Sequence, residues 1–322
     1  MPSLQDCACK RTSIRAFLNG RFRERRLSGM GLKESINLKS GLQSTPRTHP
    51  QSSADPDLVK RPIGVFDSGI GGLSILKALR TELPHEDFVY VADSGHAPYG
   101  ERDDAHVIAR SSAITVHLLA QYNIQALVIA CNTATAAAIT TLRQAHPRLP
   151  IIGVEPALKP ALALSKTRRI GVMATRGTLG SAKFGALVAS MAAEAEFSCQ
   201  PCDGLADAIE RQDYSKIIAL CDYYTGATGR FGTNNGEIDT LVLGCTHYPF
   251  VSDALRKSVG PDVQLIDTGE AVARQTRRQL PEHSSADSVG TCRLLSTGDP
   301  SALHWAAQRW LGLDEPVNSL LV

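Results

Sequence analysis

The sequence lacks the features that direct a chain into a membrane or out of the cell. Within its 322 residues, no apolar run approaches the roughly 18 residues that a membrane-spanning helix needs. The basic residues near its start are not followed by the apolar segment, about 7 to 15 residues long, of a secretory signal. Without an export signal, its eight cysteines favour free thiols in a reducing compartment over a disulfide framework. We therefore expect a cytoplasmic protein without membrane contact.

Signals for cofactors and metals are also scarce. The glycine-rich segment 67–72 is not a G-x-G-x-x-G pattern, and no acidic residue clearly ends a following strand as a ribose ligand would. Cys199 and Cys202 form a C-x-x-C, but no second C-x-x-C and no pair of closely spaced histidines follows to complete a zinc site. We expect no metal and no cofactor.

Charge is unevenly distributed along the chain. The formal net charge is only +2, yet residues 1–60 hold 11 Lys and Arg against 5 Asp and Glu. This segment has no periodic apolar pattern, which is typical of a disordered basic extension. A transit peptide or a polyanion-binding tail would have a similar composition, but an unstructured extension is favoured, and no nucleic acid partner is expected.

From residue 62 onward, strand-like and helix-like segments alternate. Short apolar runs with β-branched residues lie at 63–66, 88–92, 126–130, 151–154, 169–173 and 241–243. Helical patterns lie at 73–83, 105–121, 135–145, 181–194 and 303–311. This alternation predicts βαβ units and parallel sheets.

The rhythm restarts midway, so we predict an α/β protein of two similar parallel-sheet domains with the active site in the cleft between them. The first domain is expected to comprise residues 61–156 with 266–322, and the second residues 157–265. Residues 225–236, rich in Gly, Thr and Asn, are expected to form a loop. Trp305 and Trp310 of the last helical pattern are expected to pack onto the first half.

Cys131 and Cys245 occur in closely similar contexts. Each ends an apolar strand-like run and precedes small polar residues, and ligands of open α/β sheets bind at this end of the strands. A single such cysteine is ordinarily a small buried filler, but the repeated arrangement indicates two functional thiols. The polar residues are Asn132 and Thr133 after the first cysteine, and Thr246 and His247 after the second.

Two thiols suit a reaction that inverts a carbon acid. A thiolate on one face removes the α-proton and a thiol on the other face returns one, since the ordinary pKa of cysteine, about 8.5, is close to the working pH. A protonated His247 would stabilise the neighbouring thiolate, although a lone histidine is more often structural. The hydroxyl and amide donors for the developing carbanion would be Ser68, Asn132, Thr133 and Thr246.

Four blocks of this sequence resemble the signature segments of glutamate racemases, in the same order and over residues 62 to about 313. The resemblance implies cofactor-independent interconversion of L- and D-glutamate, which supplies D-glutamate for peptidoglycan synthesis and so for the cell wall and cell shape. The blocks are Phe66-Asp67-Ser68-Gly69-Ile70-Gly71-Gly72-Leu73, Ala92-Asp93-Ser94 with Pro98-Tyr99-Gly100, Ala130-Cys131-Asn132-Thr133-Ala134, and Gly244-Cys245-Thr246-His247-Tyr248-Pro249.

The same resemblance implies roles for single residues. It implies that Cys131 acts on the D-enantiomer and Cys245 on the L-enantiomer. Asp67 is associated with the first thiol, and His247 and Glu210 with the second. Glu210 is placed by segment 204–210, where Asp203 replaces the family's proline after Cys202. The implied substrate contacts are Asp67, Ser68, Pro98, Tyr99, Gly100, Asn132, Thr133, Thr246 and His247, with Thr178 for the amino-acid headgroup.

Several alternatives stay open at this point. Aspartate racemase or another isomerase of the superfamily shares the two-thiol logic but would lack the form Thr246-His247-Tyr248-Pro249. An amino-acid-binding regulatory protein on the same scaffold would not need both cysteines. A hydrolase with Cys131 as its nucleophile would leave Cys245 unexplained. Asp67 could simply cap a helix, Tyr99 could close over a ligand or only pack, and a homodimer is left open.

Overall fold

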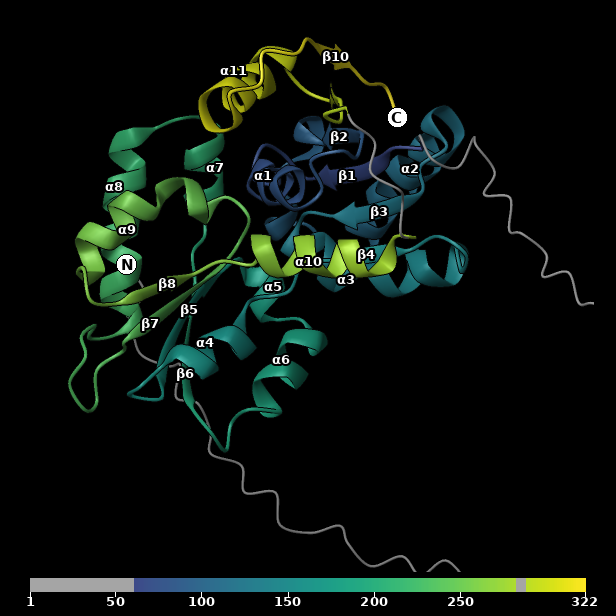
Figure 1. The fold of residues 1–322 in the computed structure, drawn as a ribbon. Helices are drawn as coiled ribbons and strands as arrows, with labels where there is room; N and C mark the ends of the chain where they lie inside the picture. The colour runs from purple at the N-terminus through teal and green to yellow at the C-terminus, as the bar shows by residue number, and fades with distance from the viewer. Residues whose placement is uncertain (1–60, 282–287) are drawn as a thin grey trace, which may run out of the picture. The chain divides into compact units, whose positions relative to one another are not determined.

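The computed structural model describes residues 61–281 and 288–322, and the predicted extension over residues 1–60 lies outside them. This part of the chain forms two parallel β-sheets with helices on their faces (Figure 1). None of the helices in the two described ranges is long and apolar enough to cross a membrane.

The first sheet has six parallel strands in the order β10-β9-β2-β1-β3-β4. The strands are β1 (Ile63–Asp67), β2 (Phe88–Ala92), β3 (Ala126–Ile129), β4 (Ile151–Gly153), β9 (Cys292–Ser296) and β10 (Val317–Ser319). One face is covered by α1 (Leu73–Glu82), α10 (Gly269–Gln279) and α11 (Pro300–Leu311), and the other by α2 (Asp104–Tyr122) and α3 (Asn132–Ala145). All of β1 is buried, as expected for a strand with helices on both faces.

The second sheet has four parallel strands in the order β6-β5-β7-β8. The strands are β5 (Arg169–Ala174), β6 (Glu196–Pro201), β7 (Thr240–Gly244) and β8 (Gln264–Ile266). Helices α4 (Leu158–Leu164) and α6 (Ala182–Ala189) pack on one face, and α7 (Leu205–Glu210), α8 (Tyr214–Thr228) and α9 (Ser252–Val259) on the other. The short elements are α5 (Arg176–Leu179) and the 3₁₀ helices η1 (Ser94–His96), η2 (Tyr99–Glu101) and η3 (Tyr248–Val251).

The two sheets share one strand plan. The order β6-β5-β7-β8 repeats β2-β1-β3-β4, so β7 takes the position in its sheet that β3 takes in the other. Cys131 and Cys245 lie just beyond the C-terminal ends of these two matching strands. The predicted fold class, α/β with two parallel sheets, is confirmed, whereas the exact domain boundaries stay a prediction.

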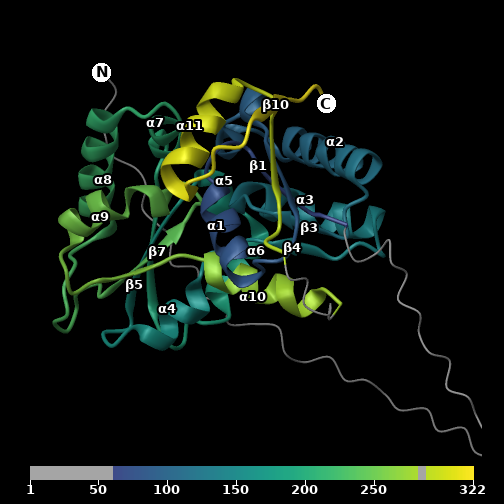
Figure 2. The ribbon, with the colours of Figure 1, turned by 45° about the horizontal axis from the view of Figure 1, so that its top comes forward.

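Helices that pack on the two different sheets contact one another at a junction beside α11. Trp305 and Trp310 pack against the core of the first sheet, which confirms the prediction for this helix. Trp310 also stacks on Phe250 of η3, with ring centroids 3.7 Å apart. The Ser74 hydroxyl of α1 donates to the Thr246 carbonyl at 2.8 Å. Figure 2 shows α11, in yellow, near both α1 and α7.

Four predicted segment boundaries are wrong by three residues or more. The helices expected over 135–145 and 303–311 each begin three residues earlier, at Asn132 and Pro300. Residues 225–228 belong to α8, because the Thr225 and Thr228 hydroxyls turn back to the helix carbonyls of Cys221 and Tyr224 and are buried there. The loop begins only at Gly229. The helix expected over 181–194 ends at Ala189, where tighter turns bring Met191 into the core.

Candidate active site

A cavity of about 240 Å³ lies at the C-terminal ends of strands from both sheets. Its walls are segments that follow β1, β2 and β3 of the first sheet and β5, β6 and β7 of the second. The structure therefore brings the two cysteines into one cavity. The predicted site residues that line it are Asp67, Ser68, Pro98, Tyr99, Gly100, Cys131, Asn132, Thr133, Glu210, Cys245, Thr246 and His247.

Cys131 lies beside a backbone amide, a hydroxyl and the Asp67 carboxyl group. It caps the N-terminus of α3, where its sulfur accepts the Ala134 amide at 3.5 Å, and the Ser68 hydroxyl lies 3.9 Å away. Burial raises the pKa of the Cys131 thiol well above its ordinary value, and the nearby Asp67 carboxylate raises it further. We conclude that this sulfur carries its proton at neutral pH.

Asp67 organises the loop beneath Cys131. Its carboxylate accepts the backbone amides of Ser68, at 2.7 Å, and of Gly72, which fixes the turn into α1. It also accepts the Thr246 hydroxyl of the other half at 3.2 Å. Burial raises the pKa of Asp67, and His247 partly opposes this. The Asp67 carboxyl group therefore holds the start of α1, as the helix-capping interpretation expects, and it also lines the cavity, while its role in catalysis stays a prediction.

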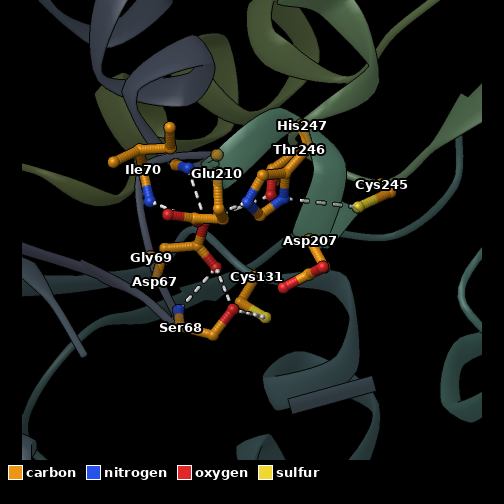
Figure 3. Close-up of polar contacts among 12 residues, drawn as sticks. Asp67, Ser68, Gly69, Ile70, Cys131, Asp207, Glu210, Cys245, Thr246 and His247 are labelled. Carbon is orange, nitrogen blue, oxygen red and sulfur yellow. Dashed lines mark hydrogen bonds and ion pairs between the residues drawn. The ribbon is translucent and has the colours of Figure 1, made fainter. Parts of the chain in front are cut away.

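Cys245 lies beside an imidazole. Its sulfur is 3.6 Å from His247 Nδ1, and His247 Nε2 is 2.6 Å from Glu210 Oε1 (Figure 3). Burial by itself lowers the pKa of His247, but the interactions with Cys245 and Glu210 outweigh it and hold that pKa well above its ordinary value. The ring is therefore favoured in its protonated form, as an imidazolium beside the Cys245 sulfur.

Gly69 and Gly71 allow Glu210 and His247 to lie close to the loop that follows β1. Glu210 Oε1 also accepts the Ile70 amide, at 2.8 Å, so it contacts both halves. A Cβ on Gly69 would lie 1.9 Å from Glu210 Oε1, and one on Gly71 would lie 2.3 Å from His247 Nδ1. Larger residues would displace Glu210 and the His247 ring, so the loop needs glycine here.

Tyr99 forms a fixed wall of the cavity and is not positioned as a lid. It is buried, and its hydroxyl donates to Asp93 at 2.6 Å. Asp93 also accepts two bonds from the Arg110 guanidinium, at 2.9 and 3.0 Å, and one from Thr297 at 2.8 Å. Although burial raises the pKa of this carboxyl, these donors outweigh it and lower the pKa below its ordinary value.

Thr178 is the one predicted contact that the structure keeps out of the cavity lining. Its hydroxyl is 2.9 Å from that of Thr175, which does line the cavity and reaches Thr133 of the other half at 3.0 Å. The signal for Thr175 was available, because it directly follows β5 as Ser68 follows β1. Further polar residues line the cavity that were not predicted from the sequence, namely Ser94, Glu101, Arg176, Cys202, Asp203, Asp207 and Arg211.

Comparisons with known proteins point to one group. The family model described as Asp/Glu/Hydantoin racemase matches residues 71–276. The chain is 46% identical over 272 residues to a glutamate racemase of Cupriavidus pinatubonensis, covering 83% of this chain and 97% of that protein. It is 48% identical over 242 residues to one of Ectopseudomonas mendocina, covering 74% and 90%.

Solved structures agree with this. A glutamate racemase of Bacillus anthracis superposes with a TM-score of 0.71 at 30% identity, covering 82% of this chain and 98% of that one. An Escherichia coli glutamate racemase, solved with L-glutamate and the activator UDP-MurNAc-Ala, superposes with a TM-score of 0.69 at 27% identity, covering 81% and 99%.

Proposed function

We propose, since the chain belongs to the glutamate racemase family, that it interconverts L- and D-glutamate with Cys131 and Cys245 as its two proton-transferring groups. One observation carries the assignment: thiols from matching strands of different sheets line the same cavity. A single-nucleophile hydrolase has no use for the second thiol.

The different settings of the thiols give the direction of proton transfer. On L-glutamate, the Cys245 thiolate beside the His247 imidazolium removes the α-proton, and the neutral Cys131 thiol delivers its own proton to the opposite face. The product is D-glutamate, with the proton now on Cys245 and the charge on Cys131. That state is ready to bind D-glutamate and run the reaction in reverse, or to exchange protons with solvent.

The remaining polar groups position the substrate in this proposal. Hydroxyl and amide donors of Ser68, Asn132, Thr133 and Thr246 stabilise the carbanion as charge moves onto the α-carboxylate. The wall of Pro98, Tyr99 and Gly100 holds the rest of the molecule. Thr178 acts through Thr175 and does not itself contact the substrate.

The cellular role follows from the chemistry. D-Glutamate made here would enter peptidoglycan synthesis, and reduced catalytic thiols are best preserved in the cytoplasm. No residue is assigned to a metal or cofactor. A homodimer stays a prediction that a measurement of molecular mass in solution would decide.

Racemisation of L-glutamate in deuterated water tests the proposal. Loss of optical rotation and gain of α-deuterium should occur together in the unmodified protein. Cys131→Ser and Cys245→Ser should each slow racemisation by on the order of 10²-fold or more, because each removes one of two required proton-transferring groups. Cys199→Ser is the control, since Cys199 is an exposed thiol outside the cavity lining and its loss should change nothing.

The outcomes separate the alternatives. Wild-type rates in either Cys131→Ser or Cys245→Ser would refute the two-thiol mechanism. Faster turnover of L-aspartate than of L-glutamate would make the protein an aspartate racemase. Binding of glutamate without α-deuteration would make it a binding protein on the same scaffold.

A further inference from the structure

The charges around the cavity present a problem for an anionic substrate. Glutamate carries two carboxylates and one ammonium group at neutral pH, which leaves one net negative charge. The acidic residues that line the cavity are Asp67, Glu101, Asp203, Asp207 and Glu210. The lining cations are Arg176, Arg211 and His247, and His247 is already bound between Glu210 and Cys245. A guanidinium is therefore the group left to attract a carboxylate.

Arg176 is well placed for this task. It is the first residue of α5 and directly follows Thr175, whose hydroxyl contacts Thr133 of the first half. Its guanidinium bonds to Asp203 in the segment after β6, and both side chains line the cavity. The two side chains are 68% and 42% exposed, so this ion pair lies where the cavity meets solvent.

The Arg176–Asp203 pair can exchange partners at little cost. An exposed ion pair contributes little to stability, because water solvates both charges well when they separate. Asp203 accepts one bond from the Arg176 guanidinium, and a guanidinium can bind a carboxylate through two parallel N–H donors, so an arriving substrate carboxylate can replace that of Asp203.

We propose that Arg176 recruits a carboxylate of the substrate at the cavity mouth and that Asp203 competes for the same guanidinium. This rests on the proposed function, because it takes glutamate as the substrate. Arg176 then contributes to the preference for an acidic amino acid, and Asp203 limits how tightly the product is held.

The same two strands supply a matched control. Arg169 and Glu196 are the first residues of β5 and β6, and they form an exposed ion pair at 2.8 Å. Arg176 and Asp203 lie beyond the other ends of these strands. Neutralising either pair changes the net charge equally, but only Arg176 and Asp203 line the cavity.

The test compares steady-state racemisation of L-glutamate by Arg176→Gln, Arg176→Lys, Asp203→Asn, Arg169→Gln and Glu196→Gln over a range of salt concentrations. Arg176→Gln should raise KM several-fold with little change in kcat, and should weaken the dependence of kcat/KM on salt. Arg176→Lys should restore most of the loss. Asp203→Asn should lower KM, and the two control variants should match the wild type.

A structural role for the pair predicts a different pattern. If Asp203→Asn raises KM as Arg176→Gln does, the pair only shapes the wall, and the proposal is wrong. If Arg176→Gln behaves like Arg169→Gln, the proposal is also wrong. Absence of turnover in the unmodified protein would overturn the proposed function and this assignment together, whereas turnover with either of these variant patterns would overturn this assignment alone.

Discussion

The segments after β3 and β7 place the same residue type at matching positions and surround it with opposite charges. Cys131 is buried beside the carboxyl group of Asp67, and both burial and this carboxyl group favour the protonated thiol, against the smaller opposite effect of the Ala134 amide. Cys245 has the His247 imidazolium. A repeated strand plan can thus supply an acid and a base, because the side chains around each thiol, and not the backbone, decide which proton state is favoured.

A second comparison concerns the segments after β2 and β6. Asp93 follows β2, is fully buried and is held by Arg110, Tyr99 and Thr297. Asp203 follows β6 and forms an exposed pair with Arg176. The segments that follow matching strands of the two sheets therefore hold a buried ion pair in one half and an exposed ion pair in the other.

The largest difference is expected in the free energy of unfolding, between Asp93→Asn and Asp203→Asn. Asp93→Asn should reduce the free energy of unfolding by about 3 kcal/mol, because it leaves the mostly buried Arg110 without its counter-charge. Asp203→Asn should leave stability unchanged. Denaturant titration of both variants measures the difference, and equal effects would remove this contrast between the halves.

The lowered pKa of Asp93 also predicts how the stability difference between wild type and Asp93→Asn changes with pH. Its pKa is lowered in the folded protein, so its stabilisation is complete above the ordinary aspartate pKa of about 3.9 and is lost as the pH falls through the folded value. The stability gap between wild type and Asp93→Asn should therefore narrow in acid. A gap that widened below pH 4 would contradict it.

The next largest effect is expected from replacing His247, whose charge distinguishes the surroundings of Cys245 from those of Cys131. His247→Asn should lower kcat/KM by on the order of 10²-fold, since the Cys245 thiolate loses its neighbouring cation. The loss must be equal from L- and D-glutamate, because the equilibrium constant of a racemisation is one. Circular dichroism starting from each pure enantiomer measures it, and a near wild-type rate would mean that the asymmetry between the thiols has no catalytic role.

A smaller effect is expected from substituting Gly71, in the loop between β1 and α1 that lies against His247. Gly71→Ala should lower kcat/KM about tenfold by displacing the His247 ring, since misplacement by a fraction of an ångström is enough. Gly226→Ala is the control, because a Cβ there meets no atom within 4 Å. That variant should keep full activity and gain roughly 1 kcal/mol from improved helix propensity in α8. Equal activity in both variants would show that the close approach to His247 is unimportant.

Sequence alone could predict the site wherever strand ends and motifs coincide. The apolar runs before Cys131 and Cys245 identify buried strands, and in parallel sheets such strands deliver their next residues to one edge. Thr175 directly follows β5 and could have been chosen by the same rule, whereas Thr178 lies three residues further on, inside α5, and does not line the cavity. Arg176 and Asp203 are distant in sequence, and their contact depends on the pairing of β5 with β6.

The same limit applies to the fold. Edge strands β8 and β10 have only three residues each, too few for a periodic pattern. Residues 225–228 have a composition typical of a loop, but buried hydroxyls bonded to helix carbonyls keep them in α8. Burial of this kind depends on tertiary neighbours that local composition does not reveal.

The stacking of Trp310 on Phe250 provides an intrinsic fluorescence signal at the junction between the two halves. The chain has two tryptophans, and both belong to α11. Because Trp310 stacks on Phe250 from the opposite half, the tryptophan emission of the unlabelled protein originates in α11, at this junction. Any opening of the two halves that accompanies substrate entry should change the intensity or wavelength of that light without an added dye.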